Sequence, residues 1–364
     1  MSSPRNLIIQ EAEETHHSKE YLNDILAYYD KLYNQGLPVI YSIHHLCLLM
    51  GDLDKKVPKI ITSRNSNYAT FKIKKRSGGK REISAPFVPL RNIQQWIYQN
   101  ILSKVPIHPS AYGFVKHKSI MDNAKVHVNQ DFILNIDLLD FFTSIPEKRV
   151  YGIFKSLGYH PNLAVYLAKA CTKNLVKEID IEVLDWLNQA PFHQNNSVLP
   201  QGAPTSPQLS NLVCRRLDKR LNNYAVKNGC KYSRYADDIT FSGSEVNNIK
   251  LGVIFRIIND EQFNVNLDKV KFFHKSSNRK IITGLIVSDK IRIPKKFKRE
   301  IARHLHFTTM NGTQNHIQHL RQYHNFDKVN YRDWLYGKIC YIKMIEPDFG
   351  LKLMTKFKSI DWGI

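Results

Sequence analysis

Three aspartates stand where apolar strands are expected to end, and they restrict the fold more than any other feature of this sequence. Residues Phe132–Asp137 form an apolar run that ends in a carboxylate, and two further apolar runs flank Asp237 and Asp238. Adjacent carboxylates repel one another unless a cation binds them. The pattern predicts a site for two metal ions, with Mg²⁺ favoured because it prefers hard oxygen ligands. A solvated turn at Asp237 and Asp238 is the alternative.

The composition favours an anionic partner. The 364 residues include 53 Lys and Arg against 32 Asp and Glu, which gives a formal net charge of +21. Such an excess indicates binding to nucleic acid or to an anionic membrane surface. No apolar run approaches the roughly 20 residues of a spanning helix, and the N-terminus lacks a signal-peptide pattern. With five scattered cysteines that we expect to be reduced, the sequence indicates a cytoplasmic protein without a membrane partner.

The apolar spacing along the chain alternates between helical and strand periods. A period near 3.6 predicts helices and a period of two predicts strands, and a glycine turn separates the two strands of the first hairpin. We expect helices over 8–35, 41–50 and 89–104, hairpins over 68–86 and 232–242, short strands over 281–287 and 290–293, and basic helices from Pro294 onward. Without internal repeats or linkers, these elements indicate contiguous lobes of one α+β protein.

Three segments resemble motifs of reverse transcriptases and occur in the order of that family. They are the strand-borne aspartate motif at Phe132–Ile145, the Leu-Pro-Gln-Gly-x-x-x-Ser-Pro loop at Leu199–Pro207, and the Tyr-x-Asp-Asp box at Tyr235–Asp238. The resemblance implies an RNA-directed DNA polymerase with a right-hand fold of fingers, palm and thumb. It implies an N-terminal helical extension (1–50), fingers with part of the palm (51–130), an antiparallel palm (131–290) with an insertion near 174–198, and a basic helical thumb (291–364).

The resemblance also assigns a nucleotide-binding set, namely Lys72, Arg81, Asp140, Phe142 and Gln201. In the family, an arginine at the position of Arg81 binds the incoming triphosphate, and either Lys72 or Lys74 would assist it. Phe142 would lie under the deoxyribose, with the alternative that it is core and that Phe141 is the exposed ring. Gln201 would lie beside the sugar and base of a deoxynucleoside triphosphate.

The predicted catalytic set is Asp137, Asp237, Asp238 and Lys269. The three aspartates are also the predicted metal ligands. Lys269 resembles the palm lysine that protonates the leaving pyrophosphate. A solvated charge beside Lys271 is the alternative for this lysine.

Two shorter elements resemble bacterial retron reverse transcriptases. Asn123 and His127 fit an Asn-Ala-x-x-His element, and Ile282-Thr283-Gly284 stands where that family has Val-Thr-Gly, with Ile in place of Val. The resemblance implies that these five residues bind RNA, with an internally satisfied helix start as the alternative for 123–127. It further implies a structured noncoding RNA as template and primer, msDNA (a branched RNA–DNA) as product, and antiphage defence with a separate effector protein.

Three other functions are compatible with parts of the sequence. A reverse transcriptase of a group II intron or of a diversity-generating element would share the palm motifs. A nucleotide cyclase would share the palm fold but has no need of the Leu199–Pro207 loop or of a basic thumb. An RNA-binding scaffold or antitoxin with a polymerase fold would not require the three aspartates.

Overall fold

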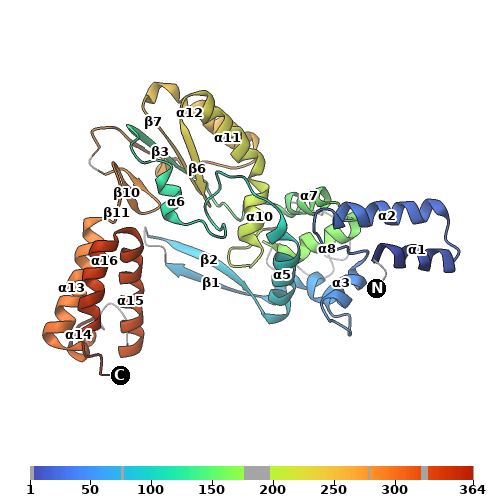
Figure 1. Ribbon diagram of the computed structural model, residues 1–364, viewed down its shortest axis with the longest axis horizontal. Helices are drawn as coiled ribbons and strands as arrows, with labels where there is room; N and C mark the ends of the chain where they lie inside the picture. Colours follow the sequence, from blue (N-terminus) through green and yellow to red (C-terminus); the bar gives the residue numbers. More distant parts are fainter. Residues whose placement is uncertain (1–3, 75–77, 176–196, 278, 321–326, 364) are drawn as a thin grey trace. The chain divides into compact units, whose positions relative to one another are not determined.

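The computed structural model describes residues 4–74, 78–175, 197–277, 279–320 and 327–363 (Figure 1). The chain forms two compact units. The first comprises Met1–Val115, Leu138–Leu221 and Leu251–Asn266, and the second comprises Lys116–Asp137, Asn222–Lys250 and Leu267–Ile364.

The N-terminal part of the first unit is helical, but the predicted helix over 8–35 is wrong as a single element. The structure has α1 (Pro4–Glu14) and α2 (Lys19–Tyr33) instead. The break follows from local chemistry, because the Ser18 side chain accepts a hydrogen bond from the Tyr21 amide and thereby caps a new helix. The predicted helix over 41–50 is confirmed as α3 (Ile43–Leu49), and α4 (Val57–Thr62) follows it.

The predicted hairpin over 68–86 is confirmed. Strands β1 (Tyr68–Lys74) and β2 (Lys80–Pro86) pair antiparallel. Gly78 and Gly79, between the strands, have φ angles of 90° and 78°, which favour glycine. The helix that follows, α5 (Val88–Asn100), confirms the start of the helix predicted over 89–104, and the short 3₁₀ turn η2 (Leu102–Lys104) ends that segment.

The rest of the first unit is mostly helical. Its remaining elements are α7 (Glu147–Leu157), α8 (Pro161–Cys171), α10 (Ser206–Val213), α12 (Leu251–Asp260) and the start of α11 (Arg215–Lys227). Two short strands, β4 (Lys173–Asn174) and β5 (Ser197–Val198), pair with each other. Most of the predicted insertion near 174–198 lies outside the described residues.

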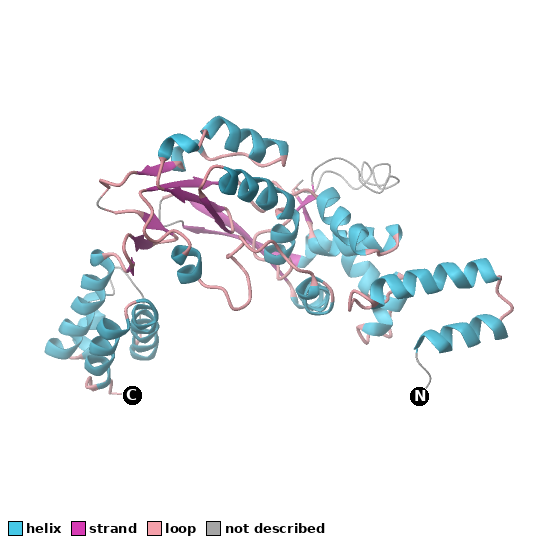
Figure 2. Ribbon diagram, turned by 45° about the horizontal axis from the view of Figure 1, so that its top comes forward, coloured by secondary structure: helices cyan, strands magenta, loops and turns pink. Residues whose placement is uncertain are grey.

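An antiparallel four-stranded sheet with the order β6-β7-β3-β8 is the centre of the second unit (Figure 2). Its strands are β3 (Phe132–Asp137), β6 (Lys231–Tyr235), β7 (Asp238–Gly243) and β8 (Lys271–Phe273). The predicted strand ending at Asp137 and the predicted hairpin over 232–242 are therefore confirmed. The short helix α6 (Ile120–Lys125) packs near β6, after a capping box at Ser119.

The segment after β8 forms a small three-stranded sheet of β9 (Ile281–Ile282), β10 (Leu285–Val287) and β11 (Ile291–Arg292). The predicted strand over 281–287 is wrong as one strand, because Thr283 and Gly284 adopt φ angles of 46° and 83° and turn the chain. This small sheet also contributes Leu285 and Val287 to an apolar cluster that includes residues of α13, α15 and α16.

Four helices end the chain and confirm the predicted basic helical segment. They are α13 (Lys295–Asn311), α14 (Thr313–Leu320), α15 (Lys328–Ile345) and α16 (Pro347–Lys358). Helices α15 and α16 pack closely, since a Cβ atom on Gly350 would lie 2.2 Å from the Lys343 Cα atom. None of the helices in the described parts of the chain is long and apolar enough to cross a membrane.

Candidate active site

The central sheet brings two of the predicted catalytic carboxylates together. Strands β3 and β7 are hydrogen-bonded neighbours, and their register sets Asp137 directly opposite Asp238. Asp238 is the first residue of β7 and pairs with Tyr235, so the turn itself consists of Ala236 and Asp237. This corrects the sequence-based expectation that Asp238 lies in the turn. Ala236 has a φ angle of 58°, which is uncommon for a residue with a side chain.

The carboxylates perturb one another. Desolvation of the Asp238 carboxyl group, followed by the negative charges of Asp237 and Asp137, raises the pKa of Asp238 to about 7. Lys269 and Lys271 oppose this shift. Neighbouring carboxylates disfavour one another's ionised form. A bound cation offsets this repulsion and so stabilises the ionised carboxylates.

Lys269 lies beside the carboxylates. Its Nζ atom donates to both carboxylate oxygens of Asp137, at 2.9 and 3.0 Å. These hydrogen bonds are the main cause that raises the pKa of Lys269, so the ammonium group keeps its proton at neutral pH. Asp137 itself is 8% exposed, and the lysine therefore neutralises a largely buried charge.

The donor set fits a hard divalent cation. Among the described residues, no group of three or more His, Cys, Asp or Glu side chains is arranged to hold a metal ion by itself. Mg²⁺ is usually held by one or two protein carboxylates, and substrate phosphates and water complete its shell. Asp137 and Asp238, which lie opposite each other on adjacent strands, provide such a carboxylate pair.

A cavity of about 440 Å³ opens onto these carboxylates. Asp137, Asp238 and Lys269 line it together with Thr283 and Gly284 from the turn between β9 and β10. The Thr283 hydroxyl is buried and has no hydrogen-bond partner among the described residues, and its φ angle of 46° is strained for a β-branched residue. Part of the predicted RNA-binding triplet thus faces the same cavity as the carboxylates.

The predicted nucleotide-binding residues belong to the first unit. Phe141 is buried and its ring stacks with that of Phe263, with 5.8 Å between the ring centroids. Phe142 is only half-buried, and its ring lies 6.0 Å from that of Phe114. Phe141 is therefore the core residue and Phe142 the accessible ring, as the sequence analysis expected. Asp140 is exposed and has a φ angle of 47°.

The loop that carries Gln201 is fixed to the hairpin of the first unit. The Ser84 amide donates to the Gln201 carbonyl oxygen at 2.8 Å. The neighbouring Gly202 has a φ angle of 121°, and a Cβ atom there would lie 2.9 Å from the Ser84 carbonyl oxygen. Only glycine allows this close approach.

The register of the hairpin separates the two predicted triphosphate contacts. Arg81 is opposite Ile73, whereas Lys72 is opposite Glu82. Since successive side chains along a strand point to opposite faces, Lys72 and Arg81 lie on different faces of the hairpin. Both side chains are exposed, but a ligand bound to one face of the hairpin can contact only one of them.

Asn123 and His127 are both buried in the second unit, with 1% exposure each. Their burial favours the alternative of an internally satisfied helix start over a direct contact with RNA, because a side chain without exposed surface offers none to a ligand. The His127 ring instead contacts Ser233 and Ser242 within the unit. Ile282 is also 1% exposed, so within its triplet only Thr283 and Gly284 retain accessible surface.

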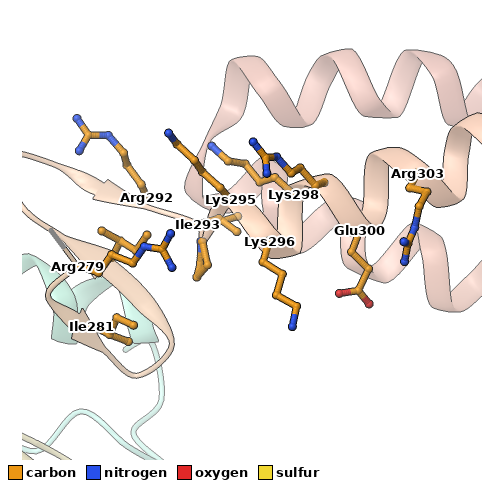
Figure 3. A pocket seen from close by; sticks show the side chains of 12 residues that line it. Arg279, Ile281, Arg292, Ile293, Lys295, Lys296, Lys298, Glu300 and Arg303 are labelled. Carbon is orange, nitrogen blue, oxygen red and sulfur yellow. The ribbon is translucent and has the colours of Figure 1, made fainter.

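A basic cavity of about 820 Å³ lies between the small sheet and the start of α13 (Figure 3). Its lining includes apolar side chains, among them Ile281 and Ile293. Its only acidic lining residue in the described chain is Glu300, whereas its basic lining residues are Arg279, Arg292, Lys295, Lys296, Lys298, Arg299 and Arg303. An excess of cations around a groove of this kind suits the phosphates of a nucleic-acid backbone.

The sequence matches the family described as reverse transcriptase (RNA-dependent DNA polymerase) over residues 73–321. It is 34% identical to the retron Ec86 reverse transcriptase of Escherichia coli over 352 residues, which cover 94% of this chain and 99% of that protein. The chain belongs to the retron reverse transcriptases. This reverse transcriptase is an RNA-directed DNA polymerase with the right-hand fold of that family, and its partners are an RNA template and deoxynucleoside triphosphates.

Further relatives extend the comparison. The retron Mx65 reverse transcriptase of Myxococcus xanthus is 33% identical, and the match covers 81% of this chain and 65% of that protein. Among solved structures, telomerase from Candida albicans in complex with a fragment of telomeric RNA is 11% identical, with a TM-score of 0.42 and coverage of 84% of this chain and 65% of that one.

Sequence reasoning missed two basic residues that the structure places at the reverse transcriptase's basic cavity. Arg279 and Arg292 precede the predicted basic helices, which were expected to begin at Pro294. The run of basic residues at the start of α13 indicated a basic surface there. The small sheet that places these two arginines at the same cavity was not predicted in full. No local sequence signal predicted this placement.

The raised pKa of Asp238 predicts a pH-dependent difference in stability between the metal-free reverse transcriptase and its Asp238→Asn variant. Below the unfolded-state pKa of about 3.9, the carboxyl group is protonated in both the folded and the unfolded protein. Its ionisation then does not affect the free energy of unfolding. As the pH rises toward and through 7, the folded protein must ionise a group that its surroundings keep protonated, so the free energy of unfolding falls.

We expect Asp238→Asn to be more stable than the unchanged protein at pH 8 by roughly 1–2 kcal/mol. This value is discounted because the residue as a whole keeps exposed surface, although desolvation of its carboxyl group is the largest cause of the raised pKa. The gap should close at pH 4. Denaturant unfolding in the presence of a chelator measures it, with Asp268→Asn as the matched carboxylate control. A gap that does not change with pH would contradict the raised pKa of Asp238.

Proposed function

We propose that this reverse transcriptase copies a structured noncoding RNA into msDNA, a branched molecule in which the DNA begins at the 2′-hydroxyl of a guanosine in the RNA. The observation that carries the proposal is the cavity that holds Asp137 and Asp238 together with Thr283 and Gly284. In this cavity, the carboxylate pair lies beside two residues of the Ile282-Thr283-Gly284 triplet, which resembles that of retron enzymes. The match over nearly the whole length of the retron Ec86 enzyme supports the same product.

In this proposal, Asp137, Asp237 and Asp238 hold two Mg²⁺ ions. When bound, these ions supply activation of the attacking hydroxyl and charge neutralisation at the phosphates. Lys269 holds a proton on Nζ beside Asp137, in keeping with its raised pKa, and it would donate this proton to the leaving pyrophosphate. Much of the catalytic effect then comes from holding the attacking hydroxyl and the α-phosphate of the nucleotide in the geometry of the reaction.

The nucleotide-binding residues have separate proposed roles. Arg81 binds the triphosphate, because a planar guanidinium matches phosphate oxygens in a bidentate manner. Lys72, on the other face of the hairpin, contacts the template strand or a neighbouring phosphate instead. Phe142 packs under the sugar with Asp140 beside it in the chain, and Gln201 contacts the sugar and base.

The proposed lobes follow the sequence-based boundaries, with one change. Residues 1–50 form an N-terminal helical extension, 51–130 the fingers with part of the palm, and 131 onward the palm with its insertion near 174–198. Because β11 pairs with β10, a boundary at residue 291 would divide the small sheet. We place the start of the basic helical thumb at Pro294.

The basic cavity is the proposed contact for the RNA backbone. Its cations give affinity without sequence preference, and the exposed turn at Thr283 and Gly284 contributes closer contacts. The RNA–DNA complex would act in the cytoplasm in antiphage defence, together with a separate effector protein. The resemblance to retron enzymes supports this biological role.

A primer-independence assay tests the proposal. The purified chain receives the noncoding RNA transcribed from beside its own gene, Mg²⁺ and radiolabelled deoxynucleotides, with no DNA primer. We expect labelled DNA that remains attached to the RNA under denaturing conditions. Synthesis that strictly requires a DNA primer would favour the intron-type or diversity-generating alternative. RNA binding without synthesis would favour the scaffold or antitoxin alternative.

A further inference from the structure

The His127 ring bridges two strands of the central sheet. Its Nδ1 atom lies 2.6 Å from the Ser242 Oγ atom on β7, and its Nε2 atom lies 2.7 Å from the Ser233 Oγ atom on β6. In a neutral imidazole one nitrogen donates and the other accepts, so each serine hydroxyl takes the complementary role. Both serines are fully buried. The ring is thus the middle of a hydrogen-bonded link between neighbouring strands.

This link lies on the same face of the sheet as the carboxylates. Asp238, Thr240 and Ser242 are every second residue of β7, so their side chains lie on one face of the sheet. On the neighbouring strand β3, Asn135 lies opposite Thr240, and Asp137 lies opposite Asp238. The Thr240 hydroxyl donates to the Asn135 Oδ1 atom at 3.2 Å. One polar row therefore runs along the face from the His127 link to the carboxylate pair.

The other end of the hairpin is held as well. The buried Arg234 guanidinium donates to the Ala236 carbonyl oxygen at 3.0 Å, within the turn that precedes Asp238. Ala236 has a positive φ angle, and such backbone persists when surrounding contacts stabilise it. The turn and the strands are thus fixed by different buried side chains.

The chemistry of His127 excludes two other roles. Burial, assisted by the charge of Lys231, lowers its pKa to about 3, so the ring is neutral wherever the enzyme is folded and active. A neutral, buried ring with both nitrogens occupied neither attracts RNA phosphates nor transfers protons to a substrate. Its hydrogen bonds are costly to lose, because a buried polar group without a partner destabilises the folded state.

We propose that His127 is a positioning residue for the polymerase reaction. It holds β6 and β7 in the register that pairs Tyr235 with Asp238, and so keeps Asp238 on the face of β7 from which it meets Asp137 of β3. A slip of one residue between strands moves every side chain to the opposite face, and with it the carboxylate. The inference rests on the proposed metal-binding role of the aspartates. It replaces the RNA contact that the sequence predicted for this histidine.

The test compares His127→Ala, Ser233→Ala, Ser242→Ala and the combined variants. At a temperature where each protein is folded by circular dichroism, we measure kcat, the KM for deoxynucleotide, the Kd for RNA, and Mn²⁺ binding by electron paramagnetic resonance without nucleotide. For His127→Ala we expect at least a tenfold loss of kcat and a tenfold weaker Mn²⁺ affinity, with RNA affinity within twofold. Removing both serines should reproduce these effects, and adding His127→Ala to that double variant should add little. His127→Gln, which can still reach Ser233, should recover part of the loss.

Other outcomes overturn the proposal in distinct ways. A weaker RNA affinity with unchanged Mn²⁺ binding would restore the direct RNA contact. A lower melting temperature alone, with kcat and Mn²⁺ affinity unchanged, would leave only a structural role. The assay uses an RNA template with an annealed DNA primer, so it remains informative even if the enzyme proves unable to prime on RNA.

Discussion

The Asp238→Asn variant is expected to lose at least roughly a thousandfold in the rate of nucleotide incorporation, equivalent to about 4 kcal/mol of transition-state stabilisation. The amide keeps the shape of the side chain but removes a negative charge from the proposed metal site. Asp238 stands at the exposed start of β7, so the packing of the sheet should not change. Single-turnover primer extension on an RNA template measures the loss.

Two variants make this experiment specific. Asp137→Asn should cause a similar loss of rate, but it also removes the partner of Lys269 from a largely buried position. Asp268→Asn changes an exposed carboxylate in the same 3₁₀ turn as Lys269 and should keep a rate close to that of the unchanged enzyme. A near-normal rate for Asp238→Asn with Mg²⁺ would remove this residue from the catalytic set.

The second large effect concerns the choice between deoxyribonucleotides and ribonucleotides. Replacing Phe142 with alanine or valine should raise ribonucleotide incorporation by at least about tenfold, because the ring leaves neither space nor a hydrogen-bond partner for a 2′-hydroxyl. Deoxynucleotide use should fall only modestly. The half-buried position of Phe142 agrees with a ring that meets a ligand on one side. Single-nucleotide incorporation with paired ribo- and deoxyribonucleotides measures the ratio.

Phe141 offers a matched control in the adjacent position. Its ring is buried against that of Phe263, so Phe141→Ala should lower the free energy of unfolding by about 3–5 kcal/mol. Among the molecules that remain folded, sugar selectivity should stay as it was. If Phe142→Ala leaves the ratio unchanged, the selectivity comes from another residue.

Local patterns in the sequence predicted the elements that depend on local chemistry. The apolar run at Phe132–Asp137 was sufficient to predict β3, and the alternation before the glycine turn at Gly78 and Gly79 was sufficient to predict the first hairpin. The break between α1 and α2 also has a local signal, the capping side chain of Ser18, but the continuous apolar spacing of 8–35 obscured it. Helix caps therefore outweigh periodicity at such positions.

Features that depend on pairing between distant segments could not be predicted. Nothing near Asp137 in the sequence specifies that it lies opposite Asp238 and not one residue away, because register is set by the whole strand pair. The same holds for His127, whose partners lie more than a hundred residues further along the chain. A motif resemblance identified this histidine as important, but only the fold indicates what it contacts.

The most direct test of this account is the chemical analysis of the nucleic acid that co-purifies with the chain when it is expressed together with the DNA that flanks its gene. The account predicts a single DNA whose 5′ end is joined to an internal guanosine of an RNA. Treatment with a debranching enzyme should release that DNA, and it should be absent when the chain carries Asp238→Asn. A DNA with a free 5′ end, or one joined to an RNA 3′ end, would contradict it.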